Sequence, residues 1–200
     1  MRNKYFRGGL SPAEAPVANR NLALSPPAAL IFGAMLVRHA VPADVPAMMT
    51  IAAQAAAAAH WERNTYDRIF DPAQRGPARL ALVIEEDSAV PAAASADKPL
   101  VGFLVALCTG PDWEIENLAV LGAAQQRGLG VRLLNELVDR GRAAGAEALF
   151  LEVRESNRAA RAFYKKQGFV ESGRRPGYYR DPPEDALLYH FRLVPEEKIL

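Results

Sequence analysis

Gln125-Gln-Arg-Gly-Leu-Gly130 is a glycine-containing stretch between a predicted strand and a predicted helix. Glycine at 128 and 130 lets the backbone approach a ligand closely, and the first N–H groups of a helix have no partner inside the helix. The positive end of the helix dipole and the Arg127 side chain favour an anion at the same place. The stretch has neither the Gly-Lys-Ser/Thr of a P-loop nor the three glycines of a dinucleotide fingerprint. It predicts a diphosphate site; the alternative is a turn that only begins a helix.

Strands and helices are predicted on both sides of this stretch from the spacing of the apolar residues. Strands are expected at residues 35–39, 79–84, 100–109, 113–120, 148–153, 168–170 and 186–193. Helices are expected at residues 45–59, around 66–70, at 128–141 and at 157–167, the last with Ser156 as its N-cap. This order predicts a single α/β domain with a mixed, mostly antiparallel sheet.

The ends of the chain differ in composition from the middle. Residues 1–34 are rich in Pro, Ala, Gly and Asn without a sustained period, which predicts a flexible N-terminal extension. The domain itself is expected at residues 35–194, with a long loop at 85–99 and a C-terminal tail at 195–200. A chain that begins at Met35 is therefore expected to keep its fold and its ligand affinity.

Composition excludes several classes of function. The 200 residues carry a formal net charge of +1, so there is no overall basic field for nucleic acid or for an anionic membrane. Cys108 is the single cysteine and the three histidines lack the spacing of ligands, so neither a disulfide nor a metal is expected. No apolar run reaches the ~18 residues of a transmembrane helix, and the layout of the N-terminus is wrong for a secretory signal. We expect a cytoplasmic protein.

The glycine-containing stretch resembles the pyrophosphate loop of the GNAT acetyltransferases, whose pattern is Gln/Arg-x-x-Gly-x-Gly/Ala. Asn117-Leu-Ala-Val120, just before it, is similar to the bulged strand of that family, which binds the pantetheine arm through its backbone. The resemblance implies a sheet splayed between the strands 113–120 and 148–153, with acetyl-CoA in the opening. The residues that it implies for acetyl-CoA binding are Leu118, Ala119, Val120, Gln125, Gln126, Arg127, Gly128, Leu129, Gly130, Val131 and Asn157.

Two later segments carry the resemblance further. Residues 149–157 read Leu-Phe-Leu-Glu-Val-Arg-Glu-Ser-Asn, and residues 162–169 read Ala-Phe-Tyr-Lys-Lys-Gln-Gly-Phe. They are most similar to the bacterial ribosomal-protein alanine N-acetyltransferases (RimI type), although the 34-residue leader and the 85–99 loop depart from that pattern. The resemblance implies Glu152 as general base and Tyr164 as general acid. It implies acceptor contacts from Trp61, Glu116, Tyr178 and Tyr179.

Alternatives remain for each implied role. Period-two alternation places Leu149, Leu151 and Val153 on one face of their strand and Glu152 on the other. Glu114 and Glu116 on the preceding strand are rival bases, because a bulge there would spoil the alternation. Each residue also has a purely structural alternative. Glu152 could pair with Arg154 or Arg158, Tyr164 could serve packing, and Asn157 could only begin the helix.

The implied reaction is direct transfer of acetyl from acetyl-CoA to a primary amine. The expected acceptor is the N-terminal α-amine of a protein or peptide, and the resemblance implies a ribosomal protein as the target. An α-amino group near pKa 7.8 is about 14% neutral at pH 7, whereas a lysine near 10.4 is about 0.04% neutral, so a modest base suits the former. Two alternatives are acetylation of a small amine, such as a polyamine, antibiotic or amino acid, and a module that binds CoA without turnover.

Overall fold

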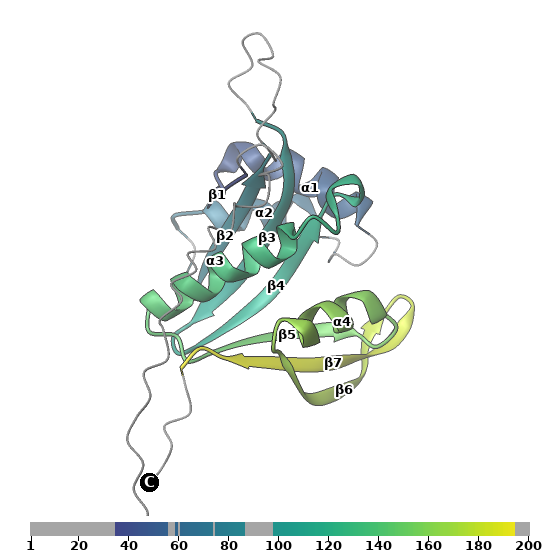
Figure 1. Ribbon diagram of the computed structural model, residues 1–200. Coiled ribbons are helices and arrows are strands. Elements are labelled where there is room, and N and C mark those ends of the chain that lie inside the picture. Colours follow the sequence, from purple (N-terminus) through teal and green to yellow (C-terminus); the bar gives the residue numbers. More distant parts are fainter. Residues whose placement is uncertain (1–34, 56–58, 60, 74, 87–97, 195–200) are drawn as a thin grey trace, which may run out of the picture. The chain divides into compact units, whose positions relative to one another are not determined.

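The computed structural model describes residues 35–55, 59, 61–73, 75–86 and 98–194 (Figure 1). The predictions for the extension at 1–34, for the tail at 195–200 and for most of the loop at 85–99 lie outside these residues. All described residues belong to one compact unit, Gly33–Leu200. Among them, no helix is both long and apolar enough to cross a membrane.

The described residues contain one sheet of seven strands in the order β1-β2-β3-β4-β5-β7-β6 (Figure 1). The strands are β1 Leu36–His39, β2 Ala78–Glu85, β3 Leu100–Thr109, β4 Asp112–Val120, β5 Ala148–Arg154, β6 Val170–Arg180 and β7 Pro183–Arg192. Every neighbouring pair is antiparallel except β4 and β5, which are parallel. The predicted mixed, mostly antiparallel sheet is therefore confirmed.

The sheet opens between its two parallel strands. β4 and β5 pair only where Asp112–Ile115 faces Ala148–Leu151. Beyond this short ladder, both strands continue to their ends without pairing with each other, and Figure 1 shows them diverging there. The bulge expected in β4 falls at Glu116, because Ile115 and Asn117 face consecutive residues of β3. The splay is confirmed, and it leaves one edge of β4 without a strand partner.

Helices cover both faces of the sheet. On one face lie α3 Leu129–Ala143 and α4 Arg158–Lys166, and on the other lie α1 Val45–Gln54 and α2 Arg63–Asp67, with short 3-10 turns at Pro42–Asp44, Arg68–Phe70 and Gly122–Ala124 (Figure 1). The sheet alternates between two hydrophobic cores: Leu82 and Ile84 pack with α3, whereas Ala81 and Val83 pack with α1. Each face therefore has its own apolar layer.

Two helix boundaries differ from the predicted ones. The helix expected to reach residue 59 ends at Gln54, and Ala55 is extended. The Asn117 side-chain amide donates a hydrogen bond of 2.9 Å to the Ala59 carbonyl, so contact with β4 overrides the helix preference of the alanine run. Asn157, not Ser156, is the N-cap of α4: its side chain accepts from the Ala160 N–H.

The segment after α4 contains the largest difference from the predicted elements. A strand was expected to end at residue 170, but β6 begins there and continues to Arg180. Nearly all of its residues are exposed, because β6 is an edge strand that pairs only with β7. The β6–β7 hairpin therefore places Arg175, Tyr178 and Tyr179 one strand away from β5, across β7.

Candidate active site

The glycine-containing loop stands at the N-terminus of α3 as predicted. Gly128 is the N-cap with φ +79°, and Gln126 also has a positive φ of 61°. Among the described residues, no hydrogen bond uses the backbone N–H groups of residues 126–131. Left-handed residues beside free N–H groups are typical of anion-binding turns. The geometry therefore fits a diphosphate.

Two side chains of this loop have partners within the protein. The Gln125 side-chain amide donates to the Val120 carbonyl at 3.1 Å, which fixes the loop to the end of β4. Arg127 forms an ion pair of 2.6 Å with Glu86, and both side chains are about one-third exposed. Arg127 would have to exchange or share this carboxylate to contact a phosphate.

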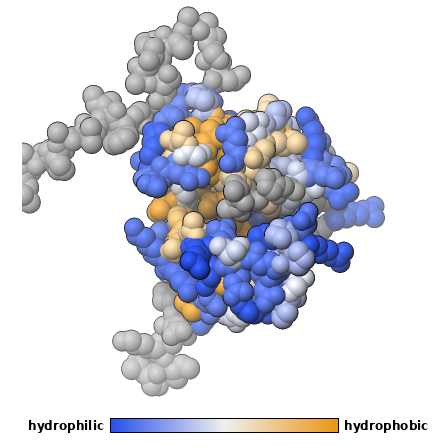
Figure 2. All heavy atoms as spheres, turned by 90° about the vertical axis from the view of Figure 1, so that its right-hand side faces the viewer, coloured by the Kyte–Doolittle hydropathy of each residue, from blue (hydrophilic) through white to orange (hydrophobic). Residues whose placement is uncertain are grey.

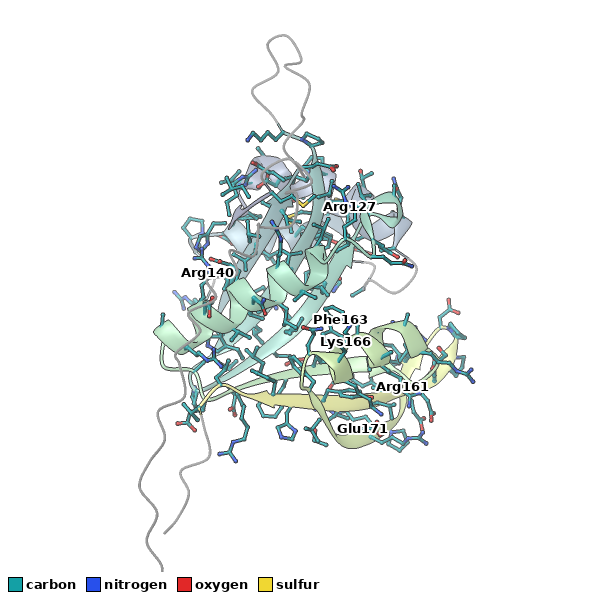
Figure 3. The ribbon with its side chains drawn as sticks, in the orientation of Figure 1. Arg127, Arg140, Arg161, Phe163, Lys166 and Glu171 are labelled. Atoms are coloured by element: carbon teal, nitrogen blue, oxygen red, sulfur yellow. The ribbon has the colours of Figure 1, made fainter. Side chains whose placement is uncertain are left out.

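Apolar side chains border the opening between the halves of the sheet. A Cβ atom on Gly130 would lie 3.4 Å from the Phe163 ring and 3.9 Å from Leu118, so the first turn of α3 approaches α4 closely. Figure 3 shows Phe163 on the side of α4 that faces α3. Leu118 and Val120 are half-buried against the same core. Ala119 and Leu129 are buried, and Val131 is half-buried. On this side Figure 2 shows apolar atoms between two hydrophilic areas.

Tyr164 belongs to α4, on the face of the sheet that α3 and α4 cover. Its ring makes edge-to-face contacts with Phe163 and Phe169, at centroid distances of 5.1 and 5.4 Å. The side chain is buried, and this burial raises the pKa of the phenol above its ordinary value. A phenol is protonated at neutral pH even without this shift, as a general acid requires.

Glu152 lies on the opposite face of β5. Leu151 and Val153 are buried with α3 and α4, which confirms the predicted alternation. The Glu152 carboxylate forms an ion pair of 2.5 Å with Arg175 of β6, not with Arg154 or Arg158. The interaction with Glu152 and partial burial raise the pKa of the Tyr178 phenol to about 12. Glu152 and Tyr164 thus flank the opening from opposite faces of the sheet.

The structure distinguishes the two rival carboxylates. Glu116, at the bulge, is held by a two-point ion pair with Arg79, at 2.7 and 2.9 Å. Glu114 has no ion pair among the described residues and lines a cavity together with Glu152 and Arg175. Burial, and then the nearby charges of Glu152 and Glu116, raise the pKa of Glu114. Glu114 is therefore the stronger rival of Glu152.

The predicted acceptor residues fall into two groups. Trp61 lies on the α1–α2 side, with its ring centroid 5.4 Å from that of Tyr66. Tyr178 and Tyr179 lie on the β6–β7 hairpin. The Arg154 guanidinium stacks on Tyr179 at 4.1 Å. Phe163 was not among the predicted site residues. From the sequence alone, Arg174, Arg175 and Arg180 could line the substrate mouth or a solvated loop, but the pairing of Arg175 with Glu152 was not predicted. The approach of Gly130 to α4 depends on tertiary packing, and an exposed edge strand has no sequence signal for its partners.

The described residues contain no group of three His, Cys, Asp or Glu side chains that could hold a metal ion. The sequence profile of the Acetyltransferase (GNAT) family matches residues 47–169, which is more than half of the chain. The chain belongs to the acetyltransferase (GNAT) family. The matched region runs from α1 to the end of α4 and so contains the loop, the opening, Glu152 and Tyr164.

Individual relatives narrow the comparison. The chain is 38% identical over 96 residues to the [ribosomal protein bS18]-alanine N-acetyltransferase of Salmonella typhimurium. The aligned residues make up 47% of this chain and 65% of that relative. The chain thus spans less than two thirds of the length of this curated relative. The crystal structure of the ribosomal-protein-S18-alanine N-acetyltransferase from Escherichia coli matches with 27% identity and a TM-score of 0.66, over 84% of this chain and 99% of that one.

A third comparison supports the fold. The crystal structure of Arabidopsis thaliana NAA60 in complex with acetyl-CoA has a TM-score of 0.67 at 19% identity, and covers 80% of this chain and 98% of that one. The matching family model and the relatives named as N-acetyltransferases agree with the class of enzyme expected from the sequence. The predicted resemblance to the GNAT family is confirmed.

The Gly128→Val substitution tests the phosphate loop. A Cβ atom at this position would meet no heavy atom within 4 Å, so a valine side chain clashes with nothing in the protein and stands in open space at the loop that carries the free N–H groups. We expect the dissociation constant of acetyl-CoA to rise at least about tenfold, equivalent to ~1.4 kcal/mol of lost binding. Calorimetric titration of the folded variant measures this.

Gly145→Val is a matched control for that experiment. Gly145 follows α3 with φ +75°, and a Cβ atom there would also meet nothing within 4 Å. Both variants should lose stability, because a branched residue is strained at positive φ. Only Gly128→Val should lose affinity for acetyl-CoA. Equal affinities in the two folded variants would remove the loop from the binding site.

Proposed function

We propose that the chain transfers the acetyl group of acetyl-CoA directly to a primary amine, and that the acceptor is the α-amine of a protein N-terminus. A ribosomal protein is the candidate acceptor, because several relatives are named as [ribosomal protein bS18]-alanine N-acetyltransferases. The observation that carries the proposal is the opening between β4 and β5, with Glu152 on one face and Tyr164 on the other. The lone cysteine suits the reducing cytosol, which we propose as the compartment.

The described residues fit acetyl-CoA along its length. The backbone N–H groups of residues 126–131, which have no partner among the described residues, would hold the diphosphate at the positive end of α3. The unpaired edge of β4 beyond Ile115 offers backbone groups to the amides of the pantetheine arm. Leu118 and Phe163 supply apolar contacts beside it. This set needs no metal.

Acetyl-CoA supplies the thioester, and the chain supplies proton transfer and positioning. Glu152 accepts a proton from the acceptor ammonium, so that the nitrogen lone pair can attack the carbonyl carbon. As the C–N bond forms and the C–S bond breaks, Tyr164 donates its proton to the departing sulfur. The second proton of the nitrogen restores the phenol, and the proton on Glu152 leaves to solvent. No side chain forms a covalent bond with the acetyl group.

A smaller acceptor is the second candidate. The cavity beside Glu152 has a volume of about 260 Å³ and is lined by both Glu114 and Glu152, which fits a compact cationic amine. A module that binds CoA without turnover is disfavoured, because a carboxylate and a protonated phenol both stand at the opening.

An acetylation assay separates these candidates. Peptides with the N-terminal sequence of protein bS18 would be compared with the same peptides carrying a blocked N-terminus and with small amines such as spermidine. We expect mass spectrometry to find acetyl on the α-nitrogen of the free peptides, with the blocked peptides unmodified. Acetylation of lysine, or turnover with small amines alone, would contradict the proposed acceptor.

A further inference from the structure

We infer that Arg175 is a positioning residue for the reaction: it orients the Glu152 carboxylate and balances the charge of the Glu152 and Glu114 pair. This inference rests on the proposed function for its kinetic part only. Arg175 lies on the edge strand β6, while Glu152 lies on β5. Their ion pair of 2.5 Å crosses β7, the strand between them in the sheet.

The register of the hairpin explains why Arg175 reaches Glu152. Glu152 faces Leu188 of β7, and Arg175 faces Ala186, two residues earlier on the same strand. Side chains two residues apart on a strand share one face. Arg175 therefore stands on the face of Glu152, diagonally across Leu188. After Arg175 the register of β6 shifts, which ends the regular ladder beside this contact.

The two side chains differ in exposure as well as in charge. Glu152 is 13% exposed, whereas Arg175 is 56% exposed and reaches inward from solvent. The Arg175 guanidinium also lies 5.7 Å from the centroid of the Tyr178 ring. Tyr178 in turn interacts with Glu152. The carboxylate is thus held from two positions on one hairpin strand, which restricts its rotation.

Charge balance gives Arg175 a second role. Glu114 and Glu152 line the same cavity, and Arg175 is the cation that lines it with them. Glu116 is neutralised separately by Arg79. Asp112 is a third carboxylate in the lining, so the cavity has three acidic side chains and one cation, and its negative charge favours a protonated amine. Without Arg175 the three carboxylates would share the cavity with no cation, and at least one of them would keep its proton to higher pH.

Other charged or titratable groups on this face do not replace Arg175. Arg154 binds Glu184 and stacks on Tyr179, so it is directed to the turn of the hairpin. The groups that face Glu152 or line its cavity are Asp112 and Glu114 from β4, Arg154 from β5, Arg175, Tyr178 and Tyr179 from β6, and Tyr189 and Glu184 from β7. Of the two arginines among them, Arg175 is the one paired with Glu152.

Arg175→Met tests the inference, because it removes the charge and keeps an unbranched apolar stem. In the pH profile of kcat/KM, we expect the midpoint of the acid limb to move up by about one pH unit, the low end for a cation beside a carboxylate. At neutral pH, kcat should fall several-fold and the Kd of acetyl-CoA should stay unchanged. Arg175→Lys should recover most of the shift, since it keeps the charge.

Arg174→Met is the matched control on the neighbouring position. Arg174 pairs with Glu155 and Asp185 and not with Glu152. Its removal should loosen the hairpin to a similar degree and leave the pH profile in place. If Arg174→Met and Arg175→Met shift the profile equally, Arg175 acts through hairpin stability alone and the inference is wrong.

A titration without turnover keeps this test independent of the proposed activity. Carbon-13 NMR of the Glu114 and Glu152 side-chain carboxyls would follow their protonation in the ligand-free protein. In Arg175→Met at least one carboxyl should titrate at higher pH than in the parent protein. Identical titration curves would overturn the inference. A shifted curve in a protein that acetylates no amine would support the role of Arg175 and refute the proposed function.

Discussion

Glu152→Gln should lower kcat for a peptide acceptor by about 10²–10⁴ at pH 7, the range of a single acid–base group. The amide keeps the shape of the side chain but cannot accept the proton of the ammonium. The loss should shrink as pH rises past about 7.8, where an α-amine deprotonates without help. Steady-state kinetics from pH 6 to pH 10 measure this convergence, and the Kd of acetyl-CoA should not change.

Glu155→Gln is the control for this substitution. Glu155 follows β5 directly and pairs with Arg174, so its change removes a carboxylate from the same region without touching the opening. Full activity of Glu152→Gln at pH 7 would show that the base is elsewhere. Glu114 would then be the next residue to test, because Glu116 is occupied by Arg79.

The sequence predicted those parts of the fold that depend on local patterns. The strand–loop–helix around residues 117–130 carries its signal in consecutive residues, namely an alternating strand, two glycines and a periodic helix. Leu149, Leu151 and Val153 likewise alternate with polar residues, and the structure buries all three. Whether the loop binds a diphosphate, and whether Glu152 and Tyr164 react, remain predictions that the substitutions test.

The misplaced elements are those decided by contacts between distant residues. The alanine run after Gln54 favours a helix locally, yet Asn117 binds the Ala59 carbonyl from β4. β6 lacks apolar alternation and contains Pro176 and Gly177, so nothing local marks it as a strand. It forms through the ladder with β7 and the ion pairs of its arginines.

The partner of Glu152 shows the same limit at the level of a single side chain. Arg154 and Arg158 are nearer in sequence, and the local pattern pointed to them. Arg154 instead pairs with Glu184 at 3.4 Å, and Arg175, twenty-three positions away, pairs with Glu152. Which arginine pairs with Glu152 depends on the register of β6 on β7. No short stretch of the sequence determines that register.

Tyr164→Phe should slow the departure of the thiolate, with kcat lower by about 10²–10⁴ and little change in the Kd of acetyl-CoA. Phenylalanine preserves the ring contacts with Phe163 and Phe169, so the variant should fold. Burial holds the pKa of the Tyr164 phenol above its ordinary value, so loss of its proton should not produce a basic limb below pH 10.

Tyr189→Phe separates catalysis from packing in this experiment. Tyr189 is also buried in the same core and lines the cavity beside Glu152, but its hydroxyl donates to Glu171 at 3.0 Å. Its loss should cost stability, by about 0.5–1.5 kcal/mol for one hydrogen bond, and leave kcat unchanged. For Tyr164→Phe, an acetyl donor with a more acidic leaving group, such as acetyl-seleno-CoA, should recover much of the lost rate, because that leaving group departs without a proton. If both donors lose rate equally, or if Tyr164→Phe retains full activity, Tyr164 serves packing and another group protonates the sulfur.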